Sequence, residues 1–432
     1  MSIAVTDGPE VVNFGCRLNI AEGEAIRAAA REAGASDMIV FNSCAVTDEA
    51  VRQARQAVRR TLRARPDADV IVTGCAAELE TARFADMGAR VVRNDAKGLV
   101  ESYDVKNRAS TSSARTQLRG DLSSRLFALS LSKGRPSLPY TPPLSGADHA
   151  RAFLGVQTGC SHSCTFCATV IARGTARSAT VEDVVKTAQI ALDRGQREII
   201  LTGVDLASYG DDSDTTLAAL VEALLGLPIE RLRLSSLDPN RVDDALFALL
   251  TQESRIMPHV HLSLQAGDDM VLTRMKRRHR RAEAVALVAR LKAARPEIAI
   301  GADLIAGFPT EDEDMFANSL ALIDDCDIVF GHIFPYSARA GTAAARMPQV
   351  GRAVARDRAA TLRAANMQRR HAWLDTQVGR TATMLVERDG LSGHAENFAA
   401  LSLTAPAAAG TIVSVRIGAR ENDRLTAREI AA

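Results

Sequence analysis

Along the first hundred residues, segments with the apolar pattern of strands alternate with segments that have the pattern of helices. Three apolar runs of strand length are separated by alanine-rich and arginine-rich segments with helical spacing: "VVNFG" (11–15), "DMIVFN" (37–42) and "ADVIVTG" (68–74). Apolar strands joined by helices are typical of a parallel sheet that is covered on both faces. The pattern predicts an open parallel α/β domain over residues 1–103.

A longer alternation of the same kind begins near residue 150. Six strand-like runs are separated by helical patterns: "FLGVQTG" (153–159), "EIILTGVDL" (198–206), "RLRLSSL" (231–237), "HVHLSLQAG" (259–267), "IGADLIAGF" (300–308) and "IVFGHIFPYS" (328–337). Eight βα units close a full barrel, so six predict an incomplete (βα)6 barrel over residues 147–372 with a lateral opening. Catalytic groups are expected at the C-terminal ends of its strands.

The remaining segments have a different character. Short alternating strands with glycine turns over residues 377–432 predict a small antiparallel β-barrel. Residues 104–146 are rich in Ser, Arg, Pro and Gly, which indicates a flexible linker or an insertion. There is neither an apolar run long enough to span a bilayer nor a signal-peptide pattern, so we expect a cytoplasmic protein without membrane contact.

Charge and cysteine content narrow the possible chemistry. The net charge of +1 argues neither for nor against a nucleic-acid partner, but arginines gather at 51–66, 274–281 and 346–370. Each run is either a phosphate-binding surface or a solvated helix face. Seven cysteines, an odd number, favour metal binding or catalysis over a disulfide framework.

Three cysteines end the three strands of the first domain. Cys16, Cys44 and Cys75 each follow an apolar run, and the carboxyl ends of parallel strands meet at one edge of a sheet. We therefore expect these thiols to converge, although about 30 residues separate neighbours. The alternative is three buried structural thiols, because free cysteine packs like a small apolar residue.

Three further cysteines directly follow the first barrel strand, in "GCSHSCTFC" (159–167). Four thiolates would satisfy a cubane iron–sulfur cluster, whereas three leave one iron open. Such an iron can bind the amino and carboxylate groups that S-adenosylmethionine presents. The competing reading is a zinc ion held by Cys160, His162, Cys164 and Cys167. Outside that reading, His162 is a neighbour of the ligands or a solvent-facing residue, and Cys326 is a structural thiol.

Taken together, the cysteine motifs resemble those of a known family. "GCSHSCTFC" followed by "ARGTARS" is similar to the cluster loop of radical S-adenosylmethionine methylthiotransferases. "NFGCRLN", "FNSCAVT" and "TGCAAE" resemble the three N-terminal motifs of that family, and the final segment resembles its TRAM domain. The resemblance implies two 4Fe-4S clusters with S-adenosylmethionine as cofactor. It assigns Cys160, Cys164 and Cys167 to the catalytic cluster and Cys16, Cys44 and Cys75 to an auxiliary one.

The resemblance also implies contacts to the cofactor. Phe166 lies where the family places an adenine contact, and Gly203, Asp205 and Gly307 lie at strand ends that line the cofactor. The two glycines are alternatively plain turn glycines. Arg173 and Arg177 in "ARGTARS" meet carboxylates or phosphates, or they lie at the surface. The sequence departs from the family at Val170 and Ile171, where a proline and an aromatic residue are usual.

Finer motif details indicate a substrate. "GCRLN", "TGCAAE" and "LTGVDLASYG" are most similar to the branch that modifies N6-threonylcarbamoyladenosine. That implies methylthio transfer to C2 of this nucleoside at position 37 of tRNA, with an external one-electron reductant and a monomeric enzyme. The alternatives are N6-isopentenyladenosine of tRNA, an aspartate of a ribosomal protein, and a non-enzymatic RNA-binding protein that contains zinc. A radical enzyme with an unrelated substrate would not need the N-terminal cysteines.

Overall fold

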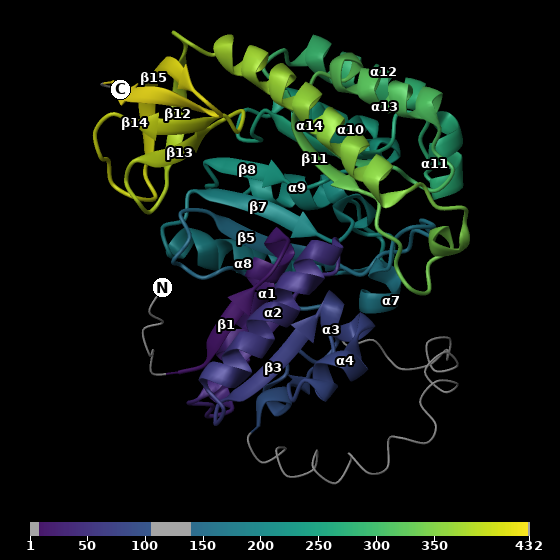
Figure 1. Ribbon diagram of the computed structural model, residues 1–432. Coiled ribbons are helices and arrows are strands. Elements are labelled where there is room, and N and C mark those ends of the chain that lie inside the picture. The colour runs from purple at the N-terminus through teal and green to yellow at the C-terminus, as the bar shows by residue number, and fades with distance from the viewer. Residues whose placement is uncertain (1–7, 105–139, 431–432) are drawn as a thin grey trace. The chain divides into compact units, whose positions relative to one another are not determined.

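The computed structural model describes residues 8–104 and 140–430 (Figure 1). The chain forms two compact units. The first unit comprises Met1–Ser145 with Thr169–Thr175, and the second comprises Gly146–Ala168 with Ala176–Ala432. Most of the segment predicted as a linker or insertion, residues 105–139, lies outside the described residues.

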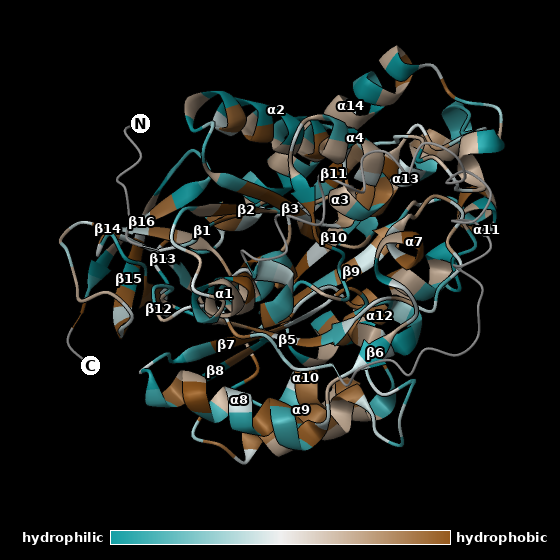
Figure 2. Ribbon diagram, turned by 90° about the horizontal axis from the view of Figure 1, so that it is seen from below, coloured by the Kyte–Doolittle hydropathy of each residue, from teal (hydrophilic) through white to brown (hydrophobic). Residues whose placement is uncertain are grey.

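The first unit is the predicted parallel α/β domain. Its sheet has the order β1-β2-β3-β4, with all pairs parallel, and consists of Glu10–Asn13, Met38–Ser43, Asp69–Gly74 and Arg90–Val91. The helical elements are α1 (Arg17–Glu32), α2 (Asp48–Ala64), α3 (Cys75–Leu79), α4 (Thr81–Asp86), η1 (Val100–Tyr103) and α7 (Thr169–Arg173). Separate cores form around Phe41, Val72 and Phe84 and around Ile26, Val40 and Ile71, because alternate residues of β2 and β3 face opposite sides. Figure 2 shows both strands as largely hydrophobic.

All six strands predicted for the incomplete barrel are present in the second unit. They are β5 (Ala152–Thr158), β7 (Glu198–Gly203), β8 (Arg231–Leu234), β9 (His259–Gln265), β10 (Ala299–Ala306) and β11 (Ile328–Pro335), and a short antiparallel strand, β6 (Arg177–Ser178), pairs with β5. The strands form two sheets, β6-β5-β7-β8 and β11-β10-β9. Between β8 and β9 the described residues show only isolated bridges, Leu232 to Ile256 and Leu237 to Leu262. We call this boundary the seam.

Helices alternate with these strands and cover one face of the sheets (Figure 1). They are α8 (Val181–Asp193), α9 (Leu217–Leu225), α10 (Asp244–Gln252), α11 (Asp269–Met275), α12 (Arg281–Ala294), α13 (Glu313–Asp325) and α14 (Arg352–Asp375), with short 3-10 turns η3 (Leu206–Ser208), η4 (Pro239–Arg241) and η5 (Ala344–Arg346). Strand residues alternate accordingly. Leu262 and Leu264 are fully buried, whereas His261 and Ser263 occupy the opposite face of β9. We call this opposite face the inner face.

The C-terminal residues form the predicted small barrel, although its strands are not all antiparallel, because β14 and β16 pair in parallel. It is closed in the order β12-β13-β14-β16-β15 and consists of Thr381–Val386, Ser392–Ala395, Ala400–Leu403, Arg424–Glu429 and Ile412–Glu421. Met384, Leu401 and Val415 are buried in its core. Strand β16, "RLTARE", was not predicted, because only Leu425 and Ala427 are apolar and buried in it.

Buried charges attach this barrel to strands β7 and β8. Arg233 donates from Nε to Glu198 Oε1 at 2.9 Å, and Arg231 donates to Thr383 Oγ1 at 2.6 Å. Burial opposes ionisation of Glu198, but Arg233, Arg151 and Arg231 lower the pKa of its carboxyl to about 2. Arg233 also donates to the carbonyl oxygens of Ala395 and Glu396.

An aromatic contact completes this attachment. Phe398 has a left-handed backbone, with φ of 70°, and its ring stacks on His394 at a centroid distance of 4.6 Å. The same ring lies 5.0 Å from His259 of β9 and 5.0 Å from the guanidinium of Arg233. The C-terminal barrel thus lies at the N-terminal ends of the second unit's strands.

Within residues 8–104 and 140–430, no helix has the length and apolar character needed to cross a bilayer.

Candidate cofactor sites

The structure brings the three N-terminal cysteines together. Cys16 precedes α1, Cys44 follows β2 and Cys75 begins α3, so each lies at the C-terminal end of a strand. Burial, with a smaller contribution from the charges of Cys16 and Cys75, raises the pKa of the Cys44 thiol to about 11. Gly15 has φ of 90° and packs against Cys44. A Cβ at Gly15 would lie 2.5 Å from Cys44 Sγ, so the absence of a side chain leaves space for the cysteine. The predicted convergence is present.

Arg173 occupies a buried position beside these thiols. It ends α7, a helix of the same unit that also carries the two family departures, Val170 and Ile171, as exposed residues. Its Nε donates to Cys75 Sγ at 3.1 Å, and its terminal nitrogens donate to Glu22 Oε1 at 2.7 Å and Asn19 Oδ1 at 2.9 Å. The sequence allowed either a carboxylate or phosphate contact or a surface position for Arg173. The structure shows the carboxylate contact, and the surface position is wrong for this residue.

A lysine completes this buried network. Lys97 donates from Nζ to Glu22 Oε2 at 2.6 Å. Burial raises the pKa of Glu22, but Arg173 and Lys97 outweigh that effect and lower it to about 2. One carboxylate therefore faces two cationic side chains. Arg173 lowers the pKa of the Cys16 and Cys44 thiols and so opposes burial, which keeps both pKa values above the usual value. The thiolate is the form that ligates metals.

The second cysteine group lies on a loop anchored within the second unit. Thr165 donates its backbone N–H to Met275 O at 3.1 Å and its hydroxyl to Arg274 O at 2.8 Å. Its own carbonyl accepts from Ala344 N at 2.8 Å. Thr165, the first of the two residues between Cys164 and Cys167, is therefore fixed through both its N–H and its carbonyl, which holds these cysteines at the C-terminal end of β5.

Negative groups surround Cys160. Burial raises the pKa of its thiol to about 12, and the charges of Asp205, Cys167 and Cys164 act in the same direction. Its Sγ lies 3.8 Å from Asp205 Oδ2. Cys160 therefore lies near the other two loop cysteines and near Asp205.

Asp205 is held by its neighbours. Its Oδ2 lies 3.0 Å from His162 Nε2 and accepts a hydrogen bond from the Ser208 hydroxyl. Burial raises the pKa of Asp205, but the contacts with His162 and Ser208 outweigh it and the net shift is downward. Since His162 is buried, it is a neighbour of the ligands and not a solvent-facing residue.

The geometry does not fit a single zinc ion. Zn–S bonds of about 2.3 Å hold ligand sulfurs closer than about 4 Å to one another. Among the described residues, neither cysteine group has three ligand atoms within 4.8 Å of one another, and including His162 does not change this. Wider spacing of three thiolates suits a larger iron–sulfur cluster. The residues therefore fit clusters, and the zinc reading loses its support.

A glutamine that sequence reasoning missed joins two strand ends at this loop. Gln157 Oε1 accepts from the backbone N–H groups of Val204 and Asp205, both at 3.0 Å. Its Nε2 donates to the carbonyls of Thr158 and Gly159. Gly203 leaves space for this glutamine, because a Cβ at Gly203 would lie 3.0 Å from Gln157 Oε1. Nothing in the sequence marks Gln157 except its place at a strand end.

Arg277 contacts the loop and not the solvent. Its side chain is 7% exposed and donates to Asp238 Oδ2 and Ser263 O, both at 2.8 Å, and to Cys164 Sγ at 3.6 Å. These contacts bridge the seam between β8 and β9. The basic run 274–281 is therefore not one phosphate-binding surface, although Arg278 within it is exposed.

The other predicted cofactor residues are accounted for by packing. Phe166 is partly buried and meets Phe308 edge-on, with centroids 6.4 Å apart. Gly307 has φ of 71°, and a Cβ there would clash with Ala355. Its N–H donates to Glu311 Oε1 at 2.8 Å. Cofactor contact at Phe166, Gly203, Asp205 and Gly307 stays a prediction, and Cys326 is a fully buried core thiol.

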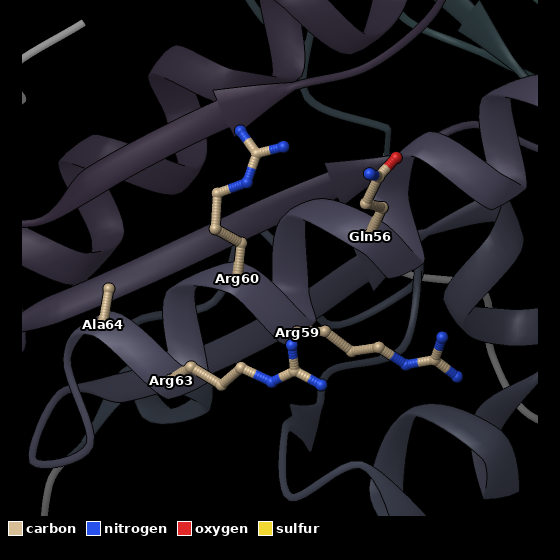
Figure 3. Close-up of a pocket in the computed structure, with 5 residues that line it drawn as sticks. All are labelled: Gln56, Arg59, Arg60, Arg63 and Ala64. Carbon is tan, nitrogen blue, oxygen red and sulfur yellow. The ribbon is translucent and has the colours of Figure 1, made fainter.

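The first arginine run lies along α2 and is exposed in part. Arg52 pairs with Glu49 and Arg55 with Glu80. Arg59 and Arg63, one helical turn apart, extend from the same side of α2 around a shallow surface depression, and Arg60 extends from another (Figure 3). All three are exposed, and no ion pair to them is found among the described residues. These guanidinium groups are available to an external anion.

Comparison with known proteins identifies the family. Residues 10–92 match the uncharacterized protein family UPF0004, and residues 154–323 match the radical SAM superfamily. A "Threonylcarbamoyladenosine tRNA methylthiotransferase MtaB" of Rickettsia prowazekii is 38% identical over 94% of both chains. A protein of the same name from Bacillus subtilis is 33% identical over 77% of this chain and 74% of its own. A "tRNA-2-methylthio-N(6)-dimethylallyladenosine synthase" of Ruegeria pomeroyi is 31% identical over 94% and 95%.

A solved structure shares the fold. The radical S-adenosylmethionine methyltransferase TsrM from Kitasatospora setae superposes with a TM-score of 0.51 at 14% identity, covering 79% of this chain and 75% of that one. With both domains matched and full-length relatives above 30% identity, the chain belongs to the radical SAM tRNA methylthiotransferase family.

Proposed function

We propose that this protein transfers a methylthio group to C2 of N6-threonylcarbamoyladenosine at position 37 of tRNA. The observation that carries the proposal is the presence of two cysteine triplets, each gathered at the C-terminal ends of parallel strands in its own unit. The full-length relatives named threonylcarbamoyladenosine tRNA methylthiotransferase supply the substrate.

The residues present indicate which groups would hold the cofactors. Cys160, Cys164 and Cys167 would bind one 4Fe-4S cluster together with S-adenosylmethionine, and Cys16, Cys44 and Cys75 would bind a second. When bound, these groups supply radical chemistry for an unactivated C–H bond and the sulfur to be transferred. An external one-electron reductant and a monomeric enzyme are part of the proposal.

The chain's own side chains position and shield these sites. Arg173 places positive charge beside the N-terminal thiolates and is fixed there by Glu22. Arg277 contacts Cys164 and is fixed by Asp238. General acid–base catalysis has no evident place here, because the carbon that is modified offers no acidic proton.

Dimethylallyl-bearing tRNA is the second candidate substrate. Relatives named for it match at 31% to 32% identity over most of the chain. This is lower than the 38% identity to the Rickettsia protein named for the threonylcarbamoyl nucleoside. Sequence similarity therefore favours the threonylcarbamoyl substrate.

Nucleoside mass spectrometry of tRNA tests the assignment. Cells that express the protein should contain 2-methylthio-N6-threonylcarbamoyladenosine, whereas cells with Cys44→Ala should accumulate the unmethylthiolated nucleoside. Purified Cys44→Ala should still form 5′-deoxyadenosine, because Cys44 lies outside the Cys160 loop. Cys326→Ala is the matched control and should behave as wild type. A methylthio group found only on isopentenyladenosine, or full product from Cys44→Ala, would contradict the proposal.

Salt dependence tests whether α2 contacts RNA. Arg59→Ala combined with Arg63→Ala should weaken tRNA binding and reduce the slope of log K against log salt by about one to two, if each residue neutralises one phosphate. The affinity is measured by fluorescence anisotropy at several salt concentrations. Arg52→Ala is the control, since Arg52 is paired with Glu49 on the same helix. An unchanged slope in the double variant would show that this arginine run is a solvated helix face.

A further inference from the structure

Three polar side chains meet on the inner face of the second unit. His261 of β9, Asp303 of β10 and His332 of β11 lie on neighbouring strands. Asp303 Oδ1 lies 3.1 Å from His261 Nε2 and 3.2 Å from His332 Nδ1. Strand register sets this arrangement, because Asp303 pairs directly with His332. Gly301 pairs with His261, and a Cβ there would clash with its ring. We call these three residues the polar triad.

The polar triad is accessible from one side. The side chain of His332 is 61% exposed and that of Asp303 is 23% exposed, whereas His261 is nearly covered at 7%. His261 is therefore the covered partner of Asp303. His332 is the exposed partner, and its Nδ1 faces Asp303, which leaves Nε2 for a ligand. None of the site chemistry described above uses these residues.

The polar triad lies next to the cysteine loop along two strands. Ser263 is two residues beyond His261 on the same face, and its carbonyl accepts from Arg277, which contacts Cys164. Ile305 is two residues beyond Asp303 and packs in the same cluster as Phe166 of the loop. Two strand residues span about 7 Å. In the other direction His259, two residues before His261, meets Phe398 of the C-terminal barrel. A substrate group bound on the inner face next to the cysteine loop would therefore contact the polar triad.

Resting on the proposed function, we propose that the polar triad binds the threonylcarbamoyl group of the substrate nucleoside. That group offers a hydroxyl and ureido N–H groups as hydrogen-bond donors, and it also carries a carboxylate, which Asp303 would repel and which must therefore point away from Asp303. Asp303 carries a carboxylate with one oxygen, Oδ1, shared by two histidines, and so has acceptor capacity left at Oδ2. His332 Nε2 is a second outward-facing acceptor when the ring is neutral.

The same chemistry discriminates against an isopentenyl group. Covering Asp303 with an apolar substituent would remove water from a carboxylate without replacing its hydrogen bonds, which is costly. A site built to hydrogen-bond its ligand rejects an analogue that lacks the polar atoms more strongly than an apolar pocket rejects an extra polar group. His261, Asp303 and His332 thus select the polar nucleoside.

Binding of three anticodon stem-loop RNAs tests this proposal. The RNAs are identical except at position 37, which carries threonylcarbamoyladenosine, isopentenyladenosine or adenosine, and the protein is the cluster-loaded enzyme. Wild type should prefer the threonylcarbamoyl RNA over the adenosine RNA. Asp303→Ala should reduce that preference about tenfold, the loss expected for a hydrogen bond to a charged group, and His332→Ala, which removes a neutral acceptor, should reduce it by a smaller factor. Neither substitution should change affinity for the adenosine RNA. His332→Gln, which keeps a polar end, should retain part of it.

The matched control is His371→Ala, since His371 on α14 forms a similar contact with a carboxylate, Asp423 of the C-terminal barrel, and is not part of the polar triad. It should leave the preference unchanged. Equal preference in wild type, Asp303→Ala and His332→Ala would overturn the role of the polar triad while leaving the proposed function intact. Wild type that never methylthiolates the threonylcarbamoyl RNA would instead overturn the proposed function.

Metal analysis covers one further outcome. Two histidines and one carboxylate with ligand atoms within 4.8 Å of one another also resemble a metal-ligand set. A stoichiometric divalent ion other than iron, present in chelator-treated wild type and lost in Asp303→Ala, would show that the polar triad holds a metal and would overturn direct recognition. Absence of such an ion supports it.

Discussion

Cys164→Ala is expected to abolish formation of 5′-deoxyadenosine from S-adenosylmethionine. The residue lies on a loop fixed through Thr165 and receives a hydrogen bond from the buried Arg277. Alanine removes one of only three thiolates, and a cluster with two protein ligands would not keep its open iron in place. Iron in anaerobically reconstituted protein should fall from about eight to about four atoms, the content of the remaining cubane cluster. Product formation is followed by liquid chromatography after reduction.

Cys326→Ala provides the comparison for this loss. Cys326 is a cysteine of the same unit that is buried in the core at the end of α13, outside both triplets. It should keep full iron content and cleavage activity. Undiminished 5′-deoxyadenosine from Cys164→Ala would refute the assignment of the loop cysteines.

Arg173→Met is expected to destabilise the first unit and to release iron from it. Methionine replaces the aliphatic part of the side chain but leaves Glu22 without the guanidinium, so that Lys97 is its remaining cationic partner in the network, and it removes the hydrogen bond to Cys75. Breaking a buried ion pair costs about 3–5 kcal/mol, and the remaining lysine places the expected loss near the lower end. Hydrogen exchange of peptides from α1 reports this change. The peptide that contains Trp373, the chain's single tryptophan, belongs to the other unit, and its hydrogen exchange serves as an internal reference that should not change.

The pH dependence of Arg173→Met should also differ from wild type. The folded pKa of Glu22 is about 2, below its ordinary value of 4.5, so its contribution to stability is present above about pH 4.5 and is lost as pH falls toward 2. Without Arg173 this acid-dependent loss should shrink. Arg52→Met, which removes an exposed pair on α2, should change stability by at most about 1 kcal/mol. Equal hydrogen exchange in Arg173→Met and Arg52→Met would contradict the stabilising role of the buried network.

Sequence patterns were sufficient for the cysteines because local periodicity determines where a parallel strand ends. Cys16, Cys44 and Cys75 each follow a strand, so a single topological rule places them together. The same reasoning placed the Cys160 loop at the end of β5. Neither inference required knowledge of side-chain contacts.

The residues that support the cysteines could not be predicted in this way. Glu22, Lys97 and Arg173 meet although up to 151 positions separate them. The motif "ARGTARS" indicated Arg173 as a carboxylate or phosphate contact, but nothing in the sequence indicated Glu22 or Lys97 as its partners. Arg277 was grouped with its basic neighbours as a phosphate contact, but one side of that run is buried against the cysteine loop. Whether such a charged residue is buried depends on the partner that neutralises it, and that partner is known only from the tertiary structure.

The third predicted domain shows a related limit. Its strand pattern predicted a barrel over residues 377–432, but not the buried contacts of Arg233 and Arg231 with it. Removing this barrel would leave Arg233 with unsatisfied donors and expose the ring of His259. Deletion is therefore a poor way to test RNA binding alone, and surface substitutions such as those on α2 are preferable.

The seam between β8 and β9 has a consequence for motion. Local opening concentrates where backbone hydrogen bonds are few, and here the two sheets share only isolated bridges among the described residues. Arg277 crosses this boundary by bonding Asp238 on one side and Ser263 on the other, and it also contacts Cys164. Opening of this boundary would therefore act on the cysteine loop through one guanidinium group. Hydrogen exchange at the amides of Leu237 and Ser263, which donate across the seam to His261 O and Leu237 O, would report this motion first.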